Sequence, residues 1–360
     1  MQNYLLKQIN KDILDIIEFD LPWIKLSNTK VLVTGANGFI GNYLVRTLLK
    51  LNEIGLLKEP LTVYAMVRDK KNSSEKFSDL VNNKYLKFFE WDLNKFLALP
   101  EFDLNYIFHA ASNASPRFYN VDPTGTILPN TIGTAHLLEL LRKSSFSNND
   151  KGFIFLSSSE IYGQNVSINK QNKFDNENKV SYEMNSFRNC YSDSKKMGET
   201  MCKAWNDQYG IPTFVARIFH TYGPGLSKDD GRVFSDFIFN VIDNIDVKVL
   251  GSGKALRSYC YISDTIRAFF TILFKGKTSF SYDVGNPNAE MNVLDLAKML
   301  VNLYPNKNLK VLSPNLNNEN HFKKEFNVIK PKIETLQEIG WSPKINPSEG
   351  FKKTIDCQIN

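Results

Sequence analysis

A tyrosine and a lysine stand four residues apart in the segment NCYSDSKKMGET, which covers residues 189–200. On a helix, residues at this spacing lie on the same face, so the side chains of Tyr191 and Lys195 would be neighbours. A lysine ammonium beside a phenol lowers the pKa of the phenol because it favours the phenolate. The pair could therefore supply a base that works near neutral pH. The same spacing also occurs by chance on solvated helices, so the decision rests on the rest of the chain.

A strand, a glycine-rich turn and a helix are predicted in residues 30–50, KVLVTGANGFIGNYLVRTLLK. Lys30–Val33 is a short β-branched apolar run, and apolar residues recur at helical spacing after it. Gly35 would allow the tight turn, Gly38 would let backbone N–H groups approach a pyrophosphate, and Gly41 would allow close helix–sheet contact. This order is typical of dinucleotide binding, whereas a tight strand–helix junction without a ligand is the alternative.

Further strands and helices alternate along the chain. The expected strands are 61–67, 86–93, 106–112, 152–159 and 213–219, and the expected helices include 131–143 and 192–209. This alternation predicts an α/β fold with a Rossmann-type, doubly wound parallel sheet. Ligands of such sheets bind beyond the carboxyl ends of the strands. Asp92, His109–Ser112 and Ser157–Glu160 fall at such ends, so we expect them to share one cleft with the Tyr191 helix.

Composition excludes several classes of protein. The 360 residues are 42% hydrophobic and 23% charged, with a net charge of +6 and no basic cluster. These values indicate a globular protein that attracts anionic small molecules and binds no nucleic acid. No apolar run reaches about 18 residues, so no membrane span is expected. Four cysteines without CxxC spacing indicate reduced thiols of a cytoplasmic protein and argue against a metal site.

Five motifs carry a resemblance to a known family: TGANGFIG (34–41), HAAS (109–112), SSSEIYG (157–163), YSDSK (191–195) and ARIFHTYGPG (216–225). With them the chain resembles the extended short-chain dehydrogenase/reductases, in the nucleotide-sugar epimerase, dehydratase and decarboxylase branch. Three stretches look most like UDP-glucuronate decarboxylases: ASNASPRFYNVDPTGTILPNTIGT (111–134), DDGRVFSDFI (229–238) and GSGKALRSYCYISD (251–264).

The resemblance implies NAD as cofactor, a nucleotide-sugar substrate and a set of site residues. Its catalytic residues would be Tyr191, Lys195, Ser158 and Glu160. Its cofactor-binding residues would be Gly35, Asn37, Gly38, Phe39, Ile40, Gly41, Arg68, Asp92, Leu93, Ala110, Ala111 and Ser112. Its substrate-binding residues would be Ser159, His220, Arg232 and Arg257.

Three departures from the decarboxylase pattern keep alternatives open. Gly125 and Leu128 stand where lysines are usual, which questions an anionic hexuronate as substrate. His220 replaces an asparagine of the motif. Arg68 follows the second strand where an acid would bind the 2′-hydroxyl of NAD, so NADP is not excluded. A C4 epimerase, a 4,6-dehydratase and a non-catalytic NAD(P)-binding protein are the alternatives to a decarboxylase.

The expected organisation has three parts. Residues 1–29 would form a helical extension, because Ile13, Ile16 and Ile17 have helical spacing and scattered acids argue against a signal peptide. Residues 30–222, with a return segment at about 259–285, would bind the cofactor. A smaller mixed α/β substrate domain would comprise 223–258 and 286–360, with a helix at 292–304 and a closing helix and turn at 330–345. Residues 168–179 read as a surface loop.

The resemblance also implies a homodimer. It would be formed by the helix at 131–143 and the Tyr191 helix through apolar positions such as Leu137, Leu138, Leu141, Met197 and Met201.

Overall fold

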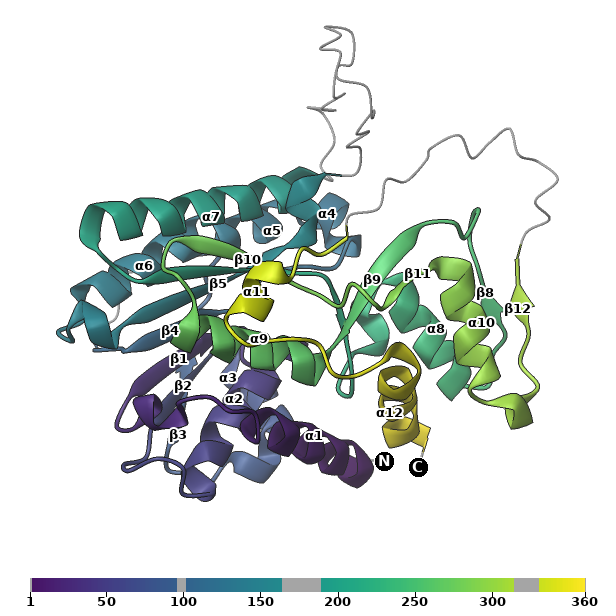
Figure 1. Ribbon diagram of the computed structural model, residues 1–360, viewed down its shortest axis with the longest axis horizontal. Coiled ribbons are helices and arrows are strands. Elements are labelled where there is room, and N and C mark those ends of the chain that lie inside the picture. The colour runs from purple at the N-terminus through teal and green to yellow at the C-terminus, as the bar shows by residue number, and fades with distance from the viewer. Residues whose placement is uncertain (1, 96–101, 164–188, 314–329, 360) are drawn as a thin grey trace, which may run out of the picture.

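A seven-stranded parallel sheet forms the centre of the protein (Figure 1). The computed structural model describes residues 2–95, 102–163, 189–313 and 330–359, so the loop expected at 168–179 lies outside the described residues. The strand order is β10-β6-β5-β4-β1-β2-β3, and every neighbouring pair is parallel. The strands are β1 (Lys30–Thr34), β2 (Thr62–Val67), β3 (Leu86–Glu90), β4 (Tyr106–His109), β5 (Gly152–Ser158), β6 (Thr213–Ile218) and β10 (Phe280–Val284).

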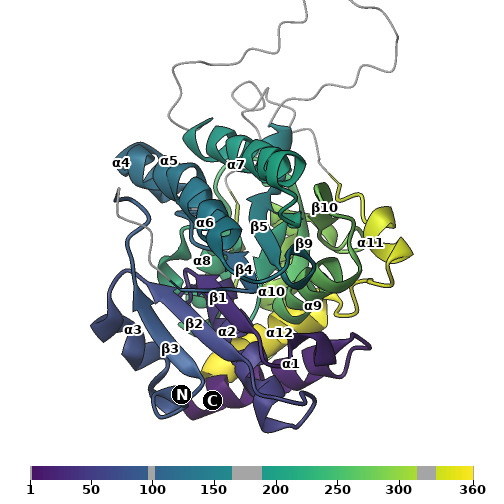
Figure 2. The ribbon, with the colours of Figure 1, turned by 90° about the vertical axis from the view of Figure 1, so that its left-hand side faces the viewer.

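Helices cover both faces of this sheet, as Figure 2 shows. Alternate residues of a strand point to opposite faces. Accordingly, Val31 and Val33 of β1 join one apolar cluster and Leu32 joins the other. One face carries α2 (Phe39–Glu53) and α9 (Ile262–Lys275), and the other carries α5 (Pro123–Asn130), α6 (Ile132–Lys143) and α7 (Asn189–Tyr209). The prediction of a doubly wound Rossmann-type sheet is confirmed.

Shorter elements connect these layers. They are α3 (Lys70–Lys76), α4 (Arg117–Val121), and the 3₁₀ turns η1 (Trp23–Leu26), η2 (Ser78–Leu80), η3 (Asn148–Asp150), η4 (Ser159–Tyr162), η5 (Lys228–Asp230) and η6 (Pro305–Lys307). In the described ranges, no helix is both long and apolar enough to cross a membrane.

The C-terminal part is a mixed α/β structure, as expected. Its three-stranded sheet has β9 (Leu256–Tyr261) at the centre, parallel to β7 (His220–Tyr222) and antiparallel to β11 (Glu290–Asn292). The remaining elements are β8 (Val247–Lys248), β12 (Val311–Leu312), α8 (Val233–Ile242), α10 (Val293–Asn302), α11 (Glu334–Glu338) and α12 (Pro347–Ile359). The helix predicted at 292–304 is α10. The closing helix predicted at 330–345 is only the five-residue α11, and α12 was not predicted.

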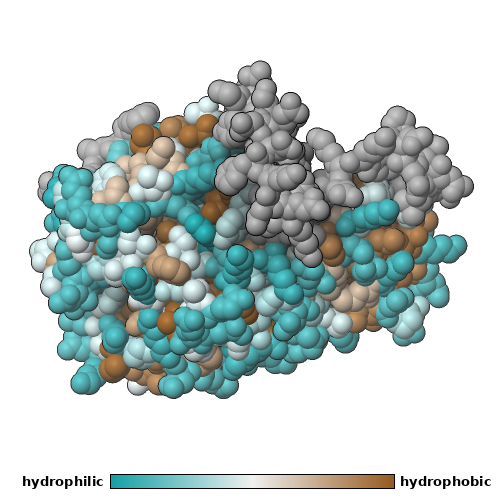
Figure 3. Space-filling view, turned by 45° about the horizontal axis from the view of Figure 1, so that its top comes forward, coloured by the Kyte–Doolittle hydropathy of each residue, from teal (hydrophilic) through white to brown (hydrophobic). Residues whose placement is uncertain are grey.

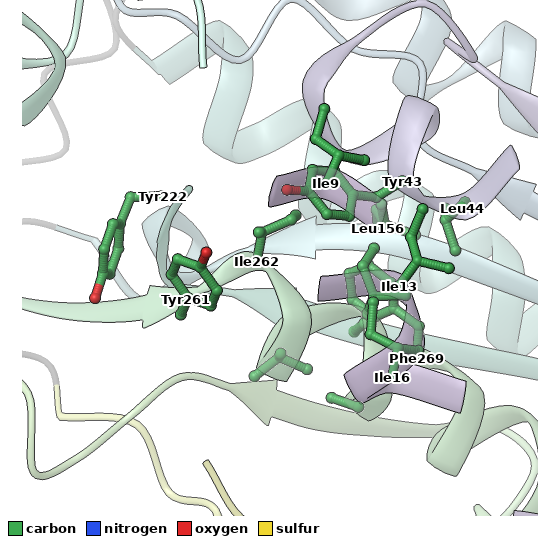
Figure 4. Close-up of a cluster of buried hydrophobic side chains, with 14 of the residues drawn as sticks. Ile9, Ile13, Ile16, Tyr43, Leu44, Leu156, Tyr222, Tyr261, Ile262 and Phe269 are labelled. Atoms are coloured by element: carbon green, nitrogen blue, oxygen red, sulfur yellow. The ribbon is translucent and has the colours of Figure 1, made fainter. Parts of the chain in front are cut away.

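The N-terminal helix α1 (Gln2–Ile17) packs on both parts of the molecule, and Figure 4 shows part of its apolar contact. Ile13 and Ile16 are buried as their spacing predicts. Immediately before Ile13, Asp12 is fully buried and accepts hydrogen bonds from the hydroxyls of Tyr43 at 2.9 Å and Tyr261 at 3.0 Å. Burial raises the pKa of Asp12 to about 6, although the two tyrosine hydrogen bonds oppose the shift. One carboxyl group therefore joins α1 to α2 and to the end of β9.

Candidate active site

The glycine-rich turn brings the ends of β1 and β4 into contact. Gly35 has φ +61°, a conformation that side chains disfavour, and a Cβ on it would lie 2.8 Å from the Cα of Ala111. A Cβ on Gly41 would lie 2.2 Å from the carbonyl oxygen of Gly35, so the first turn of α2 presses against the loop. Any larger residue at either position would push α2 away from the sheet.

A pocket opens at the carboxyl ends of β1, β2, β3 and β4. The predicted cofactor residues that line it are Gly35, Asn37, Gly38, Arg68, Asp92, Leu93, Ala110, Ala111 and Ser112. The other three, Phe39, Ile40 and Gly41, begin α2 and do not line the pocket. The N-terminus of α2 provides the free N–H groups and the positive dipole end that suit a pyrophosphate. The pocket therefore fits a dinucleotide by its backbone as well as by its side chains.

Seven lining residues were not predicted, namely Met66, Val67, Trp91, Asn94, Asn113, Gly125 and Pro129. Most of them adjoin predicted residues at the same strand ends, so the strand boundaries were a usable signal. Gly125 and Pro129 come from α5, which no local pattern links to the glycine loop. Gly125 also stands where the decarboxylase pattern has a lysine, so its position bears on the specificity of the cleft.

His109 holds the pocket wall together by two hydrogen bonds. Burial lowers the pKa of His109 to about 3, with the nearby Lys195 charge acting in the same direction, so the imidazole is neutral. Its Nε2 lies 2.9 Å from the Pro129 carbonyl oxygen and must donate there, which leaves Nδ1 to accept from the Thr34 hydroxyl at 2.9 Å. Thr34 Oγ1 in turn accepts from the Ala111 N–H at 3.0 Å. This chain fixes β1, β4 and α5 around the cleft.

Tyr191 and Lys195 lie on one face of α7 and are both buried. Lys195 Nζ is 5.7 Å from the centre of the Tyr191 ring and donates to the Leu156 carbonyl oxygen at 2.6 Å. Burial lowers the pKa of Lys195 to about 7 and raises the pKa of Tyr191. The predicted lowering of the Tyr191 pKa is therefore wrong for this arrangement, because burial and the negative charge of Glu160 outweigh the Ser158 hydrogen bond and the Arg232 charge that favour the phenolate.

Ser158 and Glu160 meet Tyr191 at the end of β5. The Ser158 hydroxyl hydrogen-bonds Tyr191, which favours the phenolate, and also accepts from the Glu160 N–H at 3.2 Å. The negative charge of Glu160 contributes to the raised pKa of Tyr191, so the two groups are close. Ser159 lies in the same turn, η4, and is half-buried. The structure thus brings all four predicted catalytic residues together.

Tyr119 of α4 completes this cluster, and it was not predicted. Its ring stacks on Tyr191, and its hydroxyl lies 3.5 Å from Glu160 Oε1. The residue belongs to the decarboxylase-like stretch 111–134, but nothing in its spacing relates it to the YxxxK motif. Only the fold places α4 over the start of α7.

Three of the four predicted substrate residues, His220, Arg232 and Arg257, gather in the C-terminal part, whereas Ser159 lies in η4. Arg232 pairs with Asp230, and Arg257 Nη1 donates to the Leu256 carbonyl oxygen at 2.7 Å. Burial lowers the pKa of His220 to about 3, and both arginine charges add to this effect, so the three side chains are neighbours. His220 Nδ1 is buried and has no hydrogen-bond partner among the described residues. Arg232 also acts electrostatically on Tyr191, which connects this cationic cluster to the catalytic residues.

The sequence profile of the NAD dependent epimerase/dehydratase family matches residues 31–285. The chain belongs to this family. The family identification establishes the cofactor class as NAD, and the pocket at the glycine turn is lined by residues that suit a dinucleotide, next to the N-terminus of α2. In the described part of the chain, no three His, Cys, Asp or Glu side chains are grouped to hold a metal ion.

Relatives of this NAD dependent epimerase/dehydratase family member cover nearly the whole chain. UDP-glucuronic acid decarboxylase 6 of Arabidopsis thaliana is 29% identical over 330 residues, which is 90% of this chain and 87% of that protein. Two solved structures share the fold. The dTDP-glucose 4,6-dehydratase of Bacillus anthracis in complex with NAD has a TM-score of 0.67 at 21% identity, covering 91% of this chain and 96% of that one. The UDP-glucose 4-epimerase of Thermotoga maritima with UDP-glucose has a TM-score of 0.68 at 23% identity, covering 91% and 98%.

Proposed function

We propose that this protein is an NAD-dependent nucleotide-sugar lyase that oxidises the sugar at C4 and then removes its C6 carboxyl group or dehydrates it. The observation that carries the proposal is the position of Glu160. Its carboxyl group shares one cluster with Tyr191, Ser158 and Tyr119, so an acid is available beside the base. The similarity to UDP-glucuronic acid decarboxylases over 90% of the chain supports the decarboxylase-like form of the reaction.

Each catalytic side chain has a distinct role in this reaction. Tyr191 takes the proton of the sugar 4-hydroxyl, and Ser158 donates a hydrogen bond to the same oxygen. NAD, when bound, accepts the hydride from C4. Lys195 lies beside the Tyr191 ring on the same face of α7, where it would bond the nicotinamide ribose, whereas the Ser158 hydrogen bond and the Arg232 charge favour the phenolate of Tyr191 against burial. The resulting 4-ketone turns a C6 carboxylate into a β-keto acid and makes the C5 proton acidic. Glu160 would add a proton to C5 after carbon dioxide leaves, or remove the C5 proton when the 6-hydroxyl is eliminated. The hydride would finally return to the sugar, so the overall reaction is redox-neutral.

The substrate is a nucleotide sugar whose diphosphate lies against Arg232 and Arg257. Guanidinium groups suit phosphate oxygens because they present several donors in one plane. Arg232 would exchange its Asp230 partner for the phosphate, and the unpartnered Nδ1 of His220 offers a further contact. Gly125 and Leu128 bring no positive charge toward C6, which favours 4,6-dehydration as the second candidate function.

The remaining proposals concern organisation. Residues 30–222 with the return segment 259–285 bind the cofactor, and 223–258 with 286–360 hold the sugar nucleotide, in a cytoplasmic protein that does not bind nucleic acid. We propose a homodimer through α5 and α7, whose exposed Ile127 and Met197 lie on an outer surface. Figure 3 views the molecule from this side and shows apolar atoms among the polar ones. Leu137, Leu138 and Leu141 cannot contribute, because they are buried within the subunit.

The test is incubation of the purified protein with UDP-, GDP-, CDP- and dTDP-sugars, followed by mass spectrometry of the products. Loss of carbon dioxide identifies a decarboxylase, and loss of water identifies a dehydratase. A product of unchanged mass but inverted C4 identifies an epimerase. No conversion of any sugar nucleotide, with NAD bound, would overturn the proposal in favour of a non-catalytic NAD-binding protein.

A further inference from the structure

A row of three polar side chains crosses the carboxyl ends of β5, β6 and β10. In the register of the parallel sheet, Ser157 of β5 lies opposite Arg217 of β6, and Arg217 lies opposite Asp283 of β10. Paired residues of neighbouring strands point to the same face of a sheet. Glu199 of α7 lies over this row and accepts hydrogen bonds from Ser157 Oγ at 2.6 Å and from Arg217 Nη2 at 2.7 Å. A single carboxylate therefore ties the catalytic helix to the ends of two strands.

The same row continues to the turn that carries Glu160. Arg217 Nη1 donates to the Tyr162 hydroxyl at 2.9 Å, and that hydroxyl donates to Asp283 Oδ1 at 2.6 Å. Asp283 Oδ2 accepts the Lys332 N–H at 3.0 Å. Tyr162 ends η4, two residues after Glu160. We name Ser157, Tyr162, Glu199, Arg217 and Asp283 the Glu199 network; it holds both η4 and α7 in place.

The network also acts on the charge of the catalytic lysine. Glu199 follows Lys195 by one turn of α7, and its carboxylate favours the ammonium form against the burial that lowers the pKa of Lys195 to about 7. The other titratable groups near Lys195 are Tyr191 and Cys202 of the same helix and His109 of β4. None of these three carries a stable negative charge at neutral pH, since burial raises the pKa of Tyr191 and Cys202 and leaves His109 neutral.

We infer that Glu199 is a positioning residue that holds Lys195 in its charged form and, through Arg217 and Tyr162, fixes the turn carrying Ser158 and Glu160. Glu199 does not touch the reacting atoms; it acts through residues that do. The inference rests on the proposed function for its catalytic consequence, but the charge coupling between Glu199 and Lys195 exists whatever the substrate is.

The first experiment measures kcat and KM of Glu199→Gln over a range of pH. The glutamine keeps the shape and most hydrogen bonds of the side chain but removes the charge. We expect kcat to fall roughly 10- to 100-fold, as for the loss of one hydrogen-bonded charge, with KM and NAD affinity nearly unchanged. Removal of the Glu199 carboxylate should lower the pKa of Lys195 further. The alkaline limb of the plot of kcat against pH should therefore move to lower pH. Glu199→Asp should restore part of the rate.

The second experiment needs no substrate. Unfolding temperatures are measured for the wild type, Glu199→Gln, Lys195→Met and the double variant, at pH 6 and pH 9. At pH 6 the Lys195 ammonium is present, so Glu199→Gln should lower the unfolding temperature more in the wild type than in the Lys195→Met background. At pH 9, where the lysine is largely neutral, this difference should disappear.

A matched control and three contrary outcomes define the test. Asp207→Asn removes an exposed carboxylate from the same helix and should change neither the pH profile nor the coupling. Wild-type turnover with an unaffected Glu199→Gln variant would overturn the inference and leave the proposed function standing. An inert wild type with the expected coupling would overturn the proposed function and keep the charge relationship. Coupling that is equal at both pH values would contradict the role of the lysine charge.

Discussion

The rings of Tyr119 and Tyr191 stack with their centroids 5.2 Å apart and their planes 13° from parallel. Tyr119 also donates to the Ala114 carbonyl oxygen at 3.1 Å, which fixes its ring over the catalytic tyrosine. Its hydroxyl lies 3.5 Å from the carboxylate of Glu160. One residue outside the YxxxK motif thus contacts both the proposed base and the proposed acid.

Replacing Tyr119 separates these two contacts. Tyr119→Leu removes the stacking, which is worth about 0.5–1.5 kcal/mol, so kcat should fall by roughly 2- to 12-fold. Tyr119→Phe keeps the ring and should change kcat less. Steady-state kinetics of both variants, with a sugar nucleotide that the mass-spectrometry panel shows to be converted, provide the measurement. A Phe variant that loses as much activity as the Leu variant would show that the hydroxyl, not the ring, is what matters.

Tyr191→Phe should nearly abolish turnover and leave NAD bound. The phenol oxygen takes the 4-hydroxyl proton, whereas the cofactor pocket is lined by the glycine turn and the ends of β1 to β4. Turnover and NAD affinity are measured on the same preparation, the second by fluorescence titration. Retained turnover with weakened NAD binding would refute the catalytic assignment.

Glu160→Gln distinguishes a lyase from an epimerase. Glutamine keeps the shape of the side chain but cannot transfer the C5 proton in the same way. Oxidation at C4 depends on Tyr191, Ser158 and Lys195, so absorbance of the reduced cofactor should still appear in a single turnover. The overall rate should then fall roughly 10²–10⁴-fold, the usual effect of losing a positioned acid or base. Near-normal turnover would instead indicate a C4 epimerase, which needs no group at C5.

Arg68→Asp tests the choice between NAD and NADP. Arg68 is exposed and lines the pocket after β2, where an arginine accommodates a 2′-phosphate and an acid binds a 2′-hydroxyl. The variant should favour NAD over NADP more than the wild type does, by roughly tenfold for about 1.4 kcal/mol. Dissociation constants for both nucleotides provide the measurement. Lys70→Asp, which makes the same charge change outside the pocket lining, is the control, and an equal effect of both variants would argue against a direct contact.

Asp12→Asn should remove a pH dependence of stability. The pKa of Asp12 is about 6 in the folded protein and 3.8 when unperturbed, so the folded state binds more protons between these values. The free energy of unfolding must therefore fall as the pH rises from about 4 to 6, by about 3 kcal/mol from this group. Asparagine has no such titration. Chemical denaturation at several pH values checks this, with exposed Asp15→Asn on the same helix as control. Equal slopes for the wild type and Asp12→Asn would contradict the prediction.

Features coded by neighbouring residues could be predicted from the sequence. The glycine turn and the four-residue step from Tyr191 to Lys195 depend on local geometry. The expected helix at 192–209 includes Lys195, and the observed α7 begins three residues earlier, at Asn189, so it includes Tyr191 as well. Tyr119 and Glu199 could not be found in this way, because their contacts depend on the register of β5 with β6 and on where α4 crosses α7. Leu137 shows another limit of prediction from sequence. An apolar position on a helix does not reveal whether the sheet of the same subunit or a partner subunit covers the side chain. The pKa of Tyr191 depends on burial, which spacing alone does not give.

Helix α1 has a consequence for the order in which the chain is made. Asp12 and its partner Tyr261 are 249 residues apart in sequence, and at about 5–20 residues per second a ribosome needs roughly 10–50 s to go from one to the other. During this interval α1 has emerged, but its apolar stripe of Ile9, Ile13 and Ile16 cannot yet reach α9, β9 or α12. Helix α2 can cover one side of α1 early, but the side that faces α9 and α12 is among the last to be covered. A nascent chain halted before β9 should present that stripe to chaperones.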